Sequence, residues 1–536
     1  MRLLQRHLVN TALMFSVVAF ATIFLYWLYT RTITLDDLSY QNNSMQILQW
    51  LGLRFNNWSQ RVFIDYTVYG ILHINSTVLP KVICGLITMG LVAVICALFR
   101  VFNPWFIATV VLLCGFQSHQ EIEGAGYFTS VINFQLPLVL GLLTVKLLLS
   151  QQIDGLKALL LFVCVLFATS LETVAFGMLA GLLVLYFYVP KQNRSFVTMC
   201  LVLCLFSLML FYLSGATDFR ICVHEEERFP EYLSTSVFYR GYVGLMTTLL
   251  YYCFNVNSFM LFLVLTVIYA LTRWSMVRML VITAVLMFLQ YMGSTVNTEL
   301  NSTLLYYRYG NTLDLTSVKI VLMFLLSCVV MGAVLHGIWR INLSRKDRIA
   351  VLSMVIVGLM MRVGMGFSPT VFFSLGRTFI FTNFAFVIAG LFILWRLELF
   401  SSNAIRTLIV CCFVFCTAPR VEFMLSDHFK NYPTYPDFLM PEEYGGILLQ
   451  CAEKYPKVTE FSTGGTVKDL YGNVVSDEER NRAVAARHKR LAAGKAPLPH
   501  VFNVSDLTIY RINYEIRKND PANHEETAKE SSLTYN

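Results

Sequence analysis

Charged side chains are scarce in this sequence of 536 residues. Asp, Glu, Lys and Arg together make up 14 %, against 56 % hydrophobic residues, and the mean hydropathy is +0.60. A soluble protein needs about 25 % charged residues to cover its surface, so most of this chain must face lipid. The net charge of +8 therefore does not indicate nucleic-acid binding, because a basic excess in a membrane protein usually lies in cytoplasmic loops.

Paired cysteine spacings are also absent. Most of the 13 cysteines lie in apolar runs, where cysteine acts as a small hydrophobic side chain, and only Cys222 and Cys451 lie in polar stretches. The lack of any C-x-x-C spacing excludes a disulfide framework and a cysteine-based zinc site. No internal repeat is evident, so the inverted-repeat signature of many secondary transporters is missing.

Long apolar runs are abundant, and they predict an all-α polytopic membrane protein with about 13 transmembrane helices. The first run follows Arg6 and lacks a small-residue cleavage site, so we expect an uncleaved first helix. Several later runs are shorter than the ~20 residues that cross a bilayer upright, so their ends must extend into polar flanks. These later runs are approximately 80–99, 104–118, 128–148, 157–171, 174–190, 196–214, 256–272, 279–293, 317–338, 349–366, 378–395 and 405–417.

The segment 238–254 is apolar enough to be a fourteenth span, and the distribution of charge argues against it. If the N-terminus is cytoplasmic and 238–254 is re-entrant or lies on the membrane, the cytoplasmic side holds 15 basic residues and three acids. Counting 238–254 as a span would put Arg340, Arg345, Lys346 and Arg348 outside. The positive-inside rule therefore favours 13 spans with the C-terminus outside.

Two domains are expected from the change in composition near residue 418. Residues 1–417 form the transmembrane domain, whose first outer loop, 31–79, is long and polar. In 418–536 the apolar density falls, and amphipathic helices are predicted over 442–455 and 477–493 with strand material over 501–516. We expect a small α/β extracytoplasmic domain that becomes disordered toward its end.

The adjacent carboxylates Asp36 and Asp37 follow the first predicted helix and are candidate catalytic residues. Neighbouring side chains point in different directions, so one carboxylate could act as a general base on an incoming hydroxyl. The alternative is structural, because Asp37 before Leu38 would cap a short helix well.

Three arginines near predicted outer helix ends are candidate phosphate ligands: Arg61, Arg220 and Arg377. A guanidinium can hold a phosphate through two parallel hydrogen bonds. For Arg61 the alternative is a membrane-interface anchor or a salt bridge to Asp65 one helical turn later. Asp218 lies two residues before Arg220 and belongs to the same polar segment.

Two acidic features complete the candidates. His119, Glu121 and Glu123 alternate along one side of an extended segment and could hold a divalent cation; the alternative is an ordinary solvated loop. Glu172 lies between two apolar runs with almost no loop. A carboxylate so close to hydrocarbon is costly unless it faces a polar cavity or a partner, so Glu172 is either functional or a buried hydrogen-bonding centre.

Several short motifs, in this order, resemble elements of the GT-C superfamily, the membrane glycosyltransferases that use polyprenyl-phosphate sugars. The chain is most similar to bacterial O-antigen-type glucosyltransferases and to a related uncharacterised bacterial polytopic family. Gln60 and Ser130 stand where that pattern has glycine, and Asp218 where it has asparagine. The motifs are Asp36–Tyr40 after the first helix, Trp58–Arg61 ("W-x-G-R"), Phe128–Pro137 with Asn133 ("W-x-x-G-x-x-N-Y-x-x-P"), Ser170–Thr173 ("H-E-N") and Ser214–Arg220 ("A-P-G-N-x-x-R").

The resemblance implies inverting sugar transfer on the extracytoplasmic face of a bacterial inner membrane. The donor would be an undecaprenyl-phosphate-linked sugar and the acceptor an envelope glycan or lipid. Asp36 or Asp37 would be the base, the arginines would hold the phosphate, and Glu172, Asn133 and Asp218 would be polar groups of the substrate site. Some members need a divalent cation such as Mg or Mn, and His119, Glu121 and Glu123 leave that open.

Two other classes of protein share some of these features. A transporter or flippase for a lipid-linked glycan would also have many helices and intramembrane charge, but alternating access needs polar groups reachable from both faces. A scaffold for envelope assembly is the third possibility. The sequence does not distinguish the donor sugar or the oligomeric state.

Overall fold

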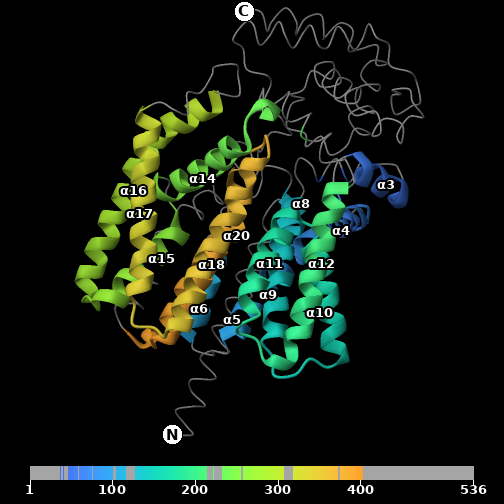
Figure 1. Cartoon of the computed structure of the whole chain (residues 1–536), viewed down its shortest axis with the longest axis horizontal. Helices are drawn as coiled ribbons and strands as arrows, with labels where there is room; N and C mark the ends of the chain where they lie inside the picture. Colours follow the sequence, from blue (N-terminus) through green and yellow to red (C-terminus); the bar gives the residue numbers. More distant parts are fainter. Residues whose placement is uncertain are drawn as a thin grey trace, which may run out of the picture.

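The computed structural model describes residues 37, 40, 46–57, 60–74, 76–99, 104–115, 127–213, 221, 232–254, 257–306, 318–371 and 375–402. These residues form a bundle of helices with no strand among them (Figure 1). The helices are α3 (Ile47–Asn57), α4 (Val62–Leu72), α5 (Val78–Phe99), α6 (Pro104–Gly115), α8 (Tyr127–Ser130), the π-helix η2 (Val131–Gln135), α9 (Leu136–Leu148), α10 (Gly155–Ala168), α11 (Glu172–Leu185), α12 (Arg194–Leu213), α14 (Val237–Phe254), α15 (Ser258–Thr272), α16 (Met276–Tyr306), α17 (Val318–Arg340), α18 (Arg345–Val363), α19 (Leu375–Thr378) and α20 (Ile380–Arg396). Short 3-10 turns are η3 (Lys191–Asn193), η4 (Tyr232–Ser234), η6 (Gly364–Phe367) and η7 (Leu399–Ser401).

The predicted apolar runs between residues 80 and 395 are all confirmed as helices. Within the described residues, five helical segments are long and apolar enough to cross a membrane, or six if a bent pair counts as one span. Shorter apolar helices such as α4, α10, α11 and α20 lie among them. The protein is therefore a helical membrane protein. The first predicted helix, the run 405–417 and the predicted domain 418–536 lie outside the described residues.

The ambiguous segment 238–254 forms α14, which meets α15 at an angle of 72°. The Asn257 side chain begins α15 by accepting a hydrogen bond from the Met260 backbone N–H at 2.8 Å, as a helix N-cap residue does. α14 packs against α16, α17 and the turn η6. The sharp bend is consistent with the expectation that this segment is not an upright span.

Close packing of α18 joins the two halves of the bundle, because α18 contacts both α11 and α20. Gly358 permits the α18–α20 approach, since a Cβ at that position would lie 2.4 Å from the Ala385 Cβ. Gly244 on α14 lies as close to η6, where a Cβ would be 2.2 Å from the Val363 carbonyl oxygen. Side chains larger than hydrogen would force these elements apart.

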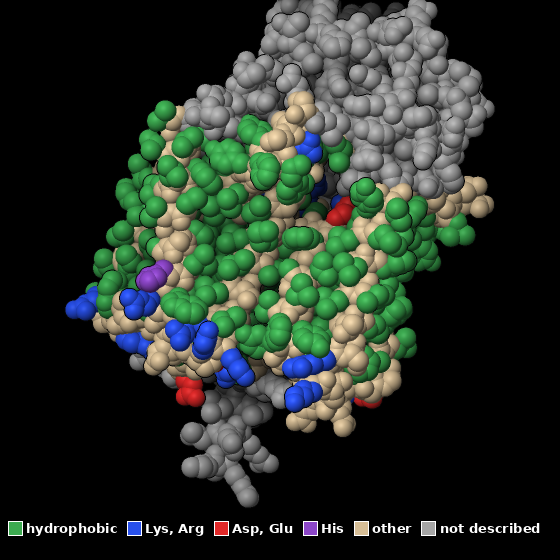
Figure 2. Space-filling view, viewed as in Figure 1, with side chains coloured by type: hydrophobic (Ala, Val, Ile, Leu, Met, Phe, Trp, Pro, Cys, Tyr) green, Lys and Arg blue, Asp and Glu red, His purple; other side chains and the backbone are tan. Residues whose placement is uncertain are grey.

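The outer surface of the bundle is apolar along its length, with Lys and Arg gathered at the lower edge (Figure 2). On α12, for example, Val202, Phe206 and Tyr212 are all exposed. An apolar surface of this extent marks a face that meets lipid.

Basic residues at the ends of several helices meet at one end of the bundle, which we call the basic end. Arg396 at the end of α20 pairs with Asp347 on α18 at 2.7 Å. The Lys146 ammonium donates to the Ala97 carbonyl at 2.6 Å, and the Tyr188 hydroxyl donates to the Lys346 carbonyl at 2.9 Å. The structure thus brings together residues that the sequence assigned to the cytoplasmic side: Lys146, Lys346, Asp347 and Arg396.

Candidate functional site

The opposite end of the bundle carries the described candidate residues, and Asp37 is the most deeply buried of them, with 0 % of its surface exposed. One carboxylate oxygen accepts the Phe128 backbone N–H at 3.1 Å. The other accepts the Thr129 N–H at 2.7 Å and the Thr129 hydroxyl at 2.5 Å. The expected helix cap therefore exists, but the helix is α8, about ninety residues away in sequence. The three donors at the helix N-terminus therefore occupy both oxygens of the Asp37 carboxylate.

The helix that Asp37 holds contains a π-turn. The span Phe128–Leu148 passes from α8 through η2 into α9, and the Leu136 N–H donates to the Val131 carbonyl five residues earlier. Pro137 follows at once and has no N–H to donate to the Asn133 carbonyl, so the regular α-helical pattern is broken there. Single π-turns inside α-helices are frequent at functional sites.

This π-turn leaves hydrogen-bond acceptors without partners. The Asn133 amide nitrogen donates to the Thr129 carbonyl at 2.8 Å, but among the described residues the Asn133 Oδ1 has no donor. The same holds for the Gln135 Oε1, although its amide nitrogen reaches the Thr88 hydroxyl. Both side chains are buried. Buried acceptors that lack a donor are suited to a ligand that carries hydroxyl groups.

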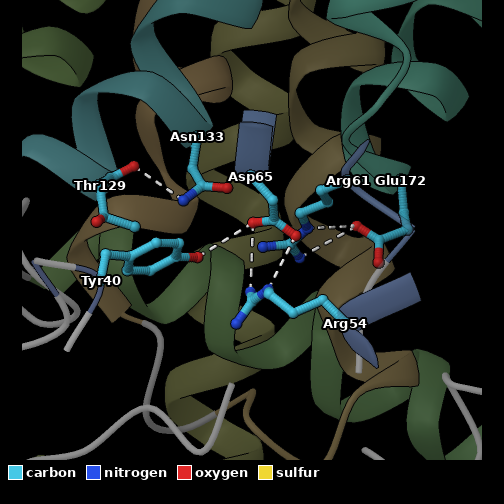
Figure 3. Close-up of polar contacts among 7 residues, drawn as sticks. All are labelled: Tyr40, Arg54, Arg61, Asp65, Thr129, Asn133 and Glu172. Carbon is cyan, nitrogen blue, oxygen red and sulfur yellow. Dashed lines mark hydrogen bonds and ion pairs between the residues drawn. The ribbon is translucent and has the colours of Figure 1, made fainter. Parts of the chain in front are cut away.

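A buried ion pair lies beside α8 (Figure 3). The Arg54 Nε lies 3.0 Å from the Asp65 Oδ2, and its Nη2 lies 3.3 Å from Oδ1. The Tyr40 hydroxyl donates to the same carboxylate at 3.1 Å. The Arg54 guanidinium also lies over the rings of Tyr40 and Trp50. This network joins Tyr40 and α3 to α4, and it occupies the carboxylate that the sequence offered as a partner for Arg61.

Arg61 instead pairs with Glu172, the first residue of α11 (Figure 3). Its Nη2 lies 3.1 Å and its Nε 3.3 Å from the same Glu172 oxygen. The two side chains remain 23 % and 26 % exposed. A carboxylate in the first turn of a helix is stabilised by the helix dipole. Because both side chains keep some solvent access, a ligand can reach this ion pair.

An apolar groove of about 530 Å³ approaches this pair from the middle of the bundle. Val174, two residues after Glu172, and Pro137, four residues after Asn133, both line it. At the other end the groove reaches Tyr188, Asp347 and Arg396. Side chains of α5, α9, α11, α18 and α20 make up its walls. The groove therefore extends from the basic end toward the polar end, as far as Pro137 and Val174.

The structure thus brings together Asp37, Arg61, Asn133 and Glu172 from four separate parts of the sequence. Arg377 lies in α19, on the segment that leads into α20. Asp36, Asp218, Arg220, His119, Glu121 and Glu123 lie outside the described residues. Among the residues that are described, no group of three His, Cys, Asp or Glu could hold a metal ion.

Sequence reasoning missed the partners Tyr40 and Arg54 and the buried amide Gln135. It also missed Arg362, a charged residue inside the apolar run 349–366, where the cost of charge in hydrocarbon could have drawn attention to it. No family model, curated protein or solved structure matches this chain.

Proposed function

We propose that this protein is a membrane glycosyltransferase that transfers a sugar from a polyprenyl-phosphate donor to an envelope glycan or lipid. The observation that carries the proposal is the apolar groove lined by Val174, two residues after Glu172, together with the partly exposed Arg61–Glu172 pair. The groove suits a prenyl chain, and a guanidinium suits a phosphate. The unpartnered acceptors at Asn133 and Gln135 suit sugar hydroxyls.

In this proposal Arg61 holds the phosphate leaving group and Glu172 positions the guanidinium. Arg220 and Arg377 are further phosphate ligands, and Asp218 is a polar group of the same site. Asp36 is the general base, because the Asp37 carboxylate is engaged with the α8 N-terminus. The base removes the acceptor hydroxyl proton as that oxygen attacks the anomeric carbon, and the bond to the phosphate oxygen breaks with inversion. One base is sufficient, since no covalent intermediate forms.

The proposal includes the finer topology expected from the sequence. It has 13 spans, a cytoplasmic N-terminus, and residues 418–536 as an extracytoplasmic α/β domain that binds the acceptor. The basic end of the bundle would face the cytoplasm of a bacterial cell, as the positive-inside rule requires. A divalent cation at His119, Glu121 and Glu123 is an optional element of the mechanism.

A flippase for a lipid-linked glycan is the second candidate. The observation that favours it is that the groove opens at the basic end and extends from there toward the polar end. A lipid moved between leaflets would need such a passage for its chain and polar contacts at both ends.

The deciding experiment measures sugar transfer in membranes supplied with labelled polyprenyl-phosphate sugars and native acceptor lipids. We expect Asp36→Asn to abolish transfer and Arg61→Gln to lower it at least ~100-fold, about 3 kcal/mol of lost transition-state binding. Asp37→Asn is expected to lower stability first, because an amide cannot accept from all three donors. Arg340→Gln, at the basic end, is the control for a lost positive charge.

Two results would contradict the proposal. If Asp36→Asn transfers sugar at the wild-type rate, Asp36 is not the general base. If the wild type transfers no sugar but moves lipid-linked glycan across liposomes, the flippase is correct instead.

A further inference from the structure

Arg362, in the last turn of α18, is completely buried, with 0 % of its surface exposed. Its Nη2 donates to the Val371 carbonyl at 3.1 Å, and its guanidinium carbon lies 4.4 Å from the centre of the Phe379 ring. Among the described residues, its Nε and Nη1 have no hydrogen-bond partner. A guanidinium carries five N–H donors, and leaving charged donors unsatisfied away from water is costly.

A second unpartnered donor is linked to the same aromatic ring through Tyr252. Asn383 lies one turn after Phe379 on α20 and is 1 % exposed. Its Oδ1 accepts the Tyr252 hydroxyl at 2.8 Å, and its Nδ2 has no acceptor among the described residues. The Tyr252 ring packs edge-on against Phe379, with the ring centres 5.4 Å apart. The hydrogen bond from Tyr252 therefore fixes the orientation of the Asn383 amide and leaves its Nδ2 without an acceptor among the described residues.

The groups left over here are all donors, whereas the amide groups left over at the π-turn, the Asn133 Oδ1 and the Gln135 Oε1, are acceptors. A site with surplus donors, one of them charged, lacks an anion. We propose that Arg362 and Asn383 form a buried oxyanion-binding site for a phosphate group. The proposal depends on these two side chains alone and not on sugar transfer.

The position of Arg362 along α18 suits a phosphate. Arg362 comes 17 residues after Arg345 at the basic end, which is ~25 Å along a helix. The hydrocarbon core of a bilayer is ~30 Å thick, so Arg362 lies near the depth of the opposite layer of headgroups. The phosphate can therefore come from a lipid headgroup or from free phosphate in the adjoining water. The turn Ser368–Val371 covers the guanidinium, so exchange of the ligand requires that turn to move.

The test uses the full-length protein in a non-ionic maltoside detergent and measures its thermal unfolding. One arm adds inorganic phosphate at constant ionic strength, and the other adds phosphatidylglycerol to the micelles. We expect at least one of them to raise the Tm of the wild type, because a ligand that binds the folded state stabilises it. Arg362→Gln should lose this response, whereas Arg340→Gln, a matched loss of charge at an exposed site, should keep it. A response to the lipid alone identifies a headgroup, and a response to phosphate alone identifies the free anion.

A second variant keeps the test decisive if Arg362→Gln does not fold. Asn383→Asp preserves the acceptor for Tyr252 and puts a carboxylate oxygen where the unpartnered amide nitrogen lies. We expect it to raise the Tm without ligand and to bind the added anion about 10-fold more weakly or worse. The proposal is overturned if neither anion changes the Tm of the wild type, or if Asn383→Asp responds as the wild type does.

Discussion

The two ends of the helical bundle use charge in opposite ways. At the basic end, Arg396 is 43 % exposed while it pairs with Asp347, and the Lys146 ammonium donates to a backbone carbonyl. At the polar end, Arg54 and Asp65 are 7 % and 1 % exposed and pair with each other across two elements. Charges at the first end remain in contact with water, whereas those at the second are part of the interior.

The contribution of a charged side chain to stability therefore depends on its burial and not on its residue type alone. An exposed pair gains little from Coulomb attraction because water screens it. Removal of one partner from a buried pair leaves the other charge uncompensated in a medium of low dielectric constant. The polar end should therefore be far more sensitive to substitution than the basic end.

The largest effect is expected from Asp65→Asn. The substitution keeps the size of the side chain but leaves the Arg54 guanidinium buried without its counter-charge. We expect a loss of about 3–5 kcal/mol in the free energy of unfolding, measured by titration with a denaturing detergent. The double variant Arg54→Met with Asp65→Leu should recover much of the loss. Equal instability of the single and double variants would show that the ion pair is not the cause.

An intermediate effect is expected where α14 approaches η6. Gly244→Ala should cost about 1–3 kcal/mol, because its Cβ would lie 2.2 Å from the Val363 carbonyl oxygen. Gly332→Ala on α17 is the matched control, because no atom lies within 4 Å of its Cβ. Alanine there should be neutral or stabilise the helix by up to ~1 kcal/mol. The same unfolding titration measures both, and equal stabilities would contradict the close approach.

The smallest effect is expected from Arg396→Gln at the basic end. Its partner Asp347 lies 2.7 Å away, but the pair is open to solvent. We expect a change of less than ~1 kcal/mol in the free energy of unfolding, and less at high salt. If this substitution is as damaging as Asp65→Asn, the contrast between the two ends is wrong.

Most helices could be predicted from the sequence because hydrophobicity is a local property. Each run of apolar residues between 80 and 395 became a helix with ends displaced by a few residues, except that α16 continues to Tyr306, beyond the predicted end at 293. The gathering of basic residues at one end was predictable for a similar reason, since consecutive spans alternate in direction. For 238–254, charge balance rather than apolarity favoured a re-entrant or surface segment, and nothing in the sequence predicted the 72° bend between α14 and α15.

The pairing of polar groups could not be predicted in the same way. Spacing along the helix favoured Asp65 as the partner of Arg61, but the partner is Glu172, 111 residues away. Likewise Asp37 was predicted to cap its own segment, but it caps α8. Such contacts depend on which helices become neighbours, and one sequence does not encode that in any local pattern.

The π-turn η2 has a further geometric consequence. A π-turn holds one residue more than the α-helical turn it replaces, and one residue corresponds to ~100° around the helix axis. Thr129 before it, and Pro137 and Gly141 after it, therefore lie at angles to one another that an uninterrupted helix would not give. This single inserted residue changes the rotation of the side chains about the helix axis. One helix can therefore present its amides to the polar end and its small side chains to the groove.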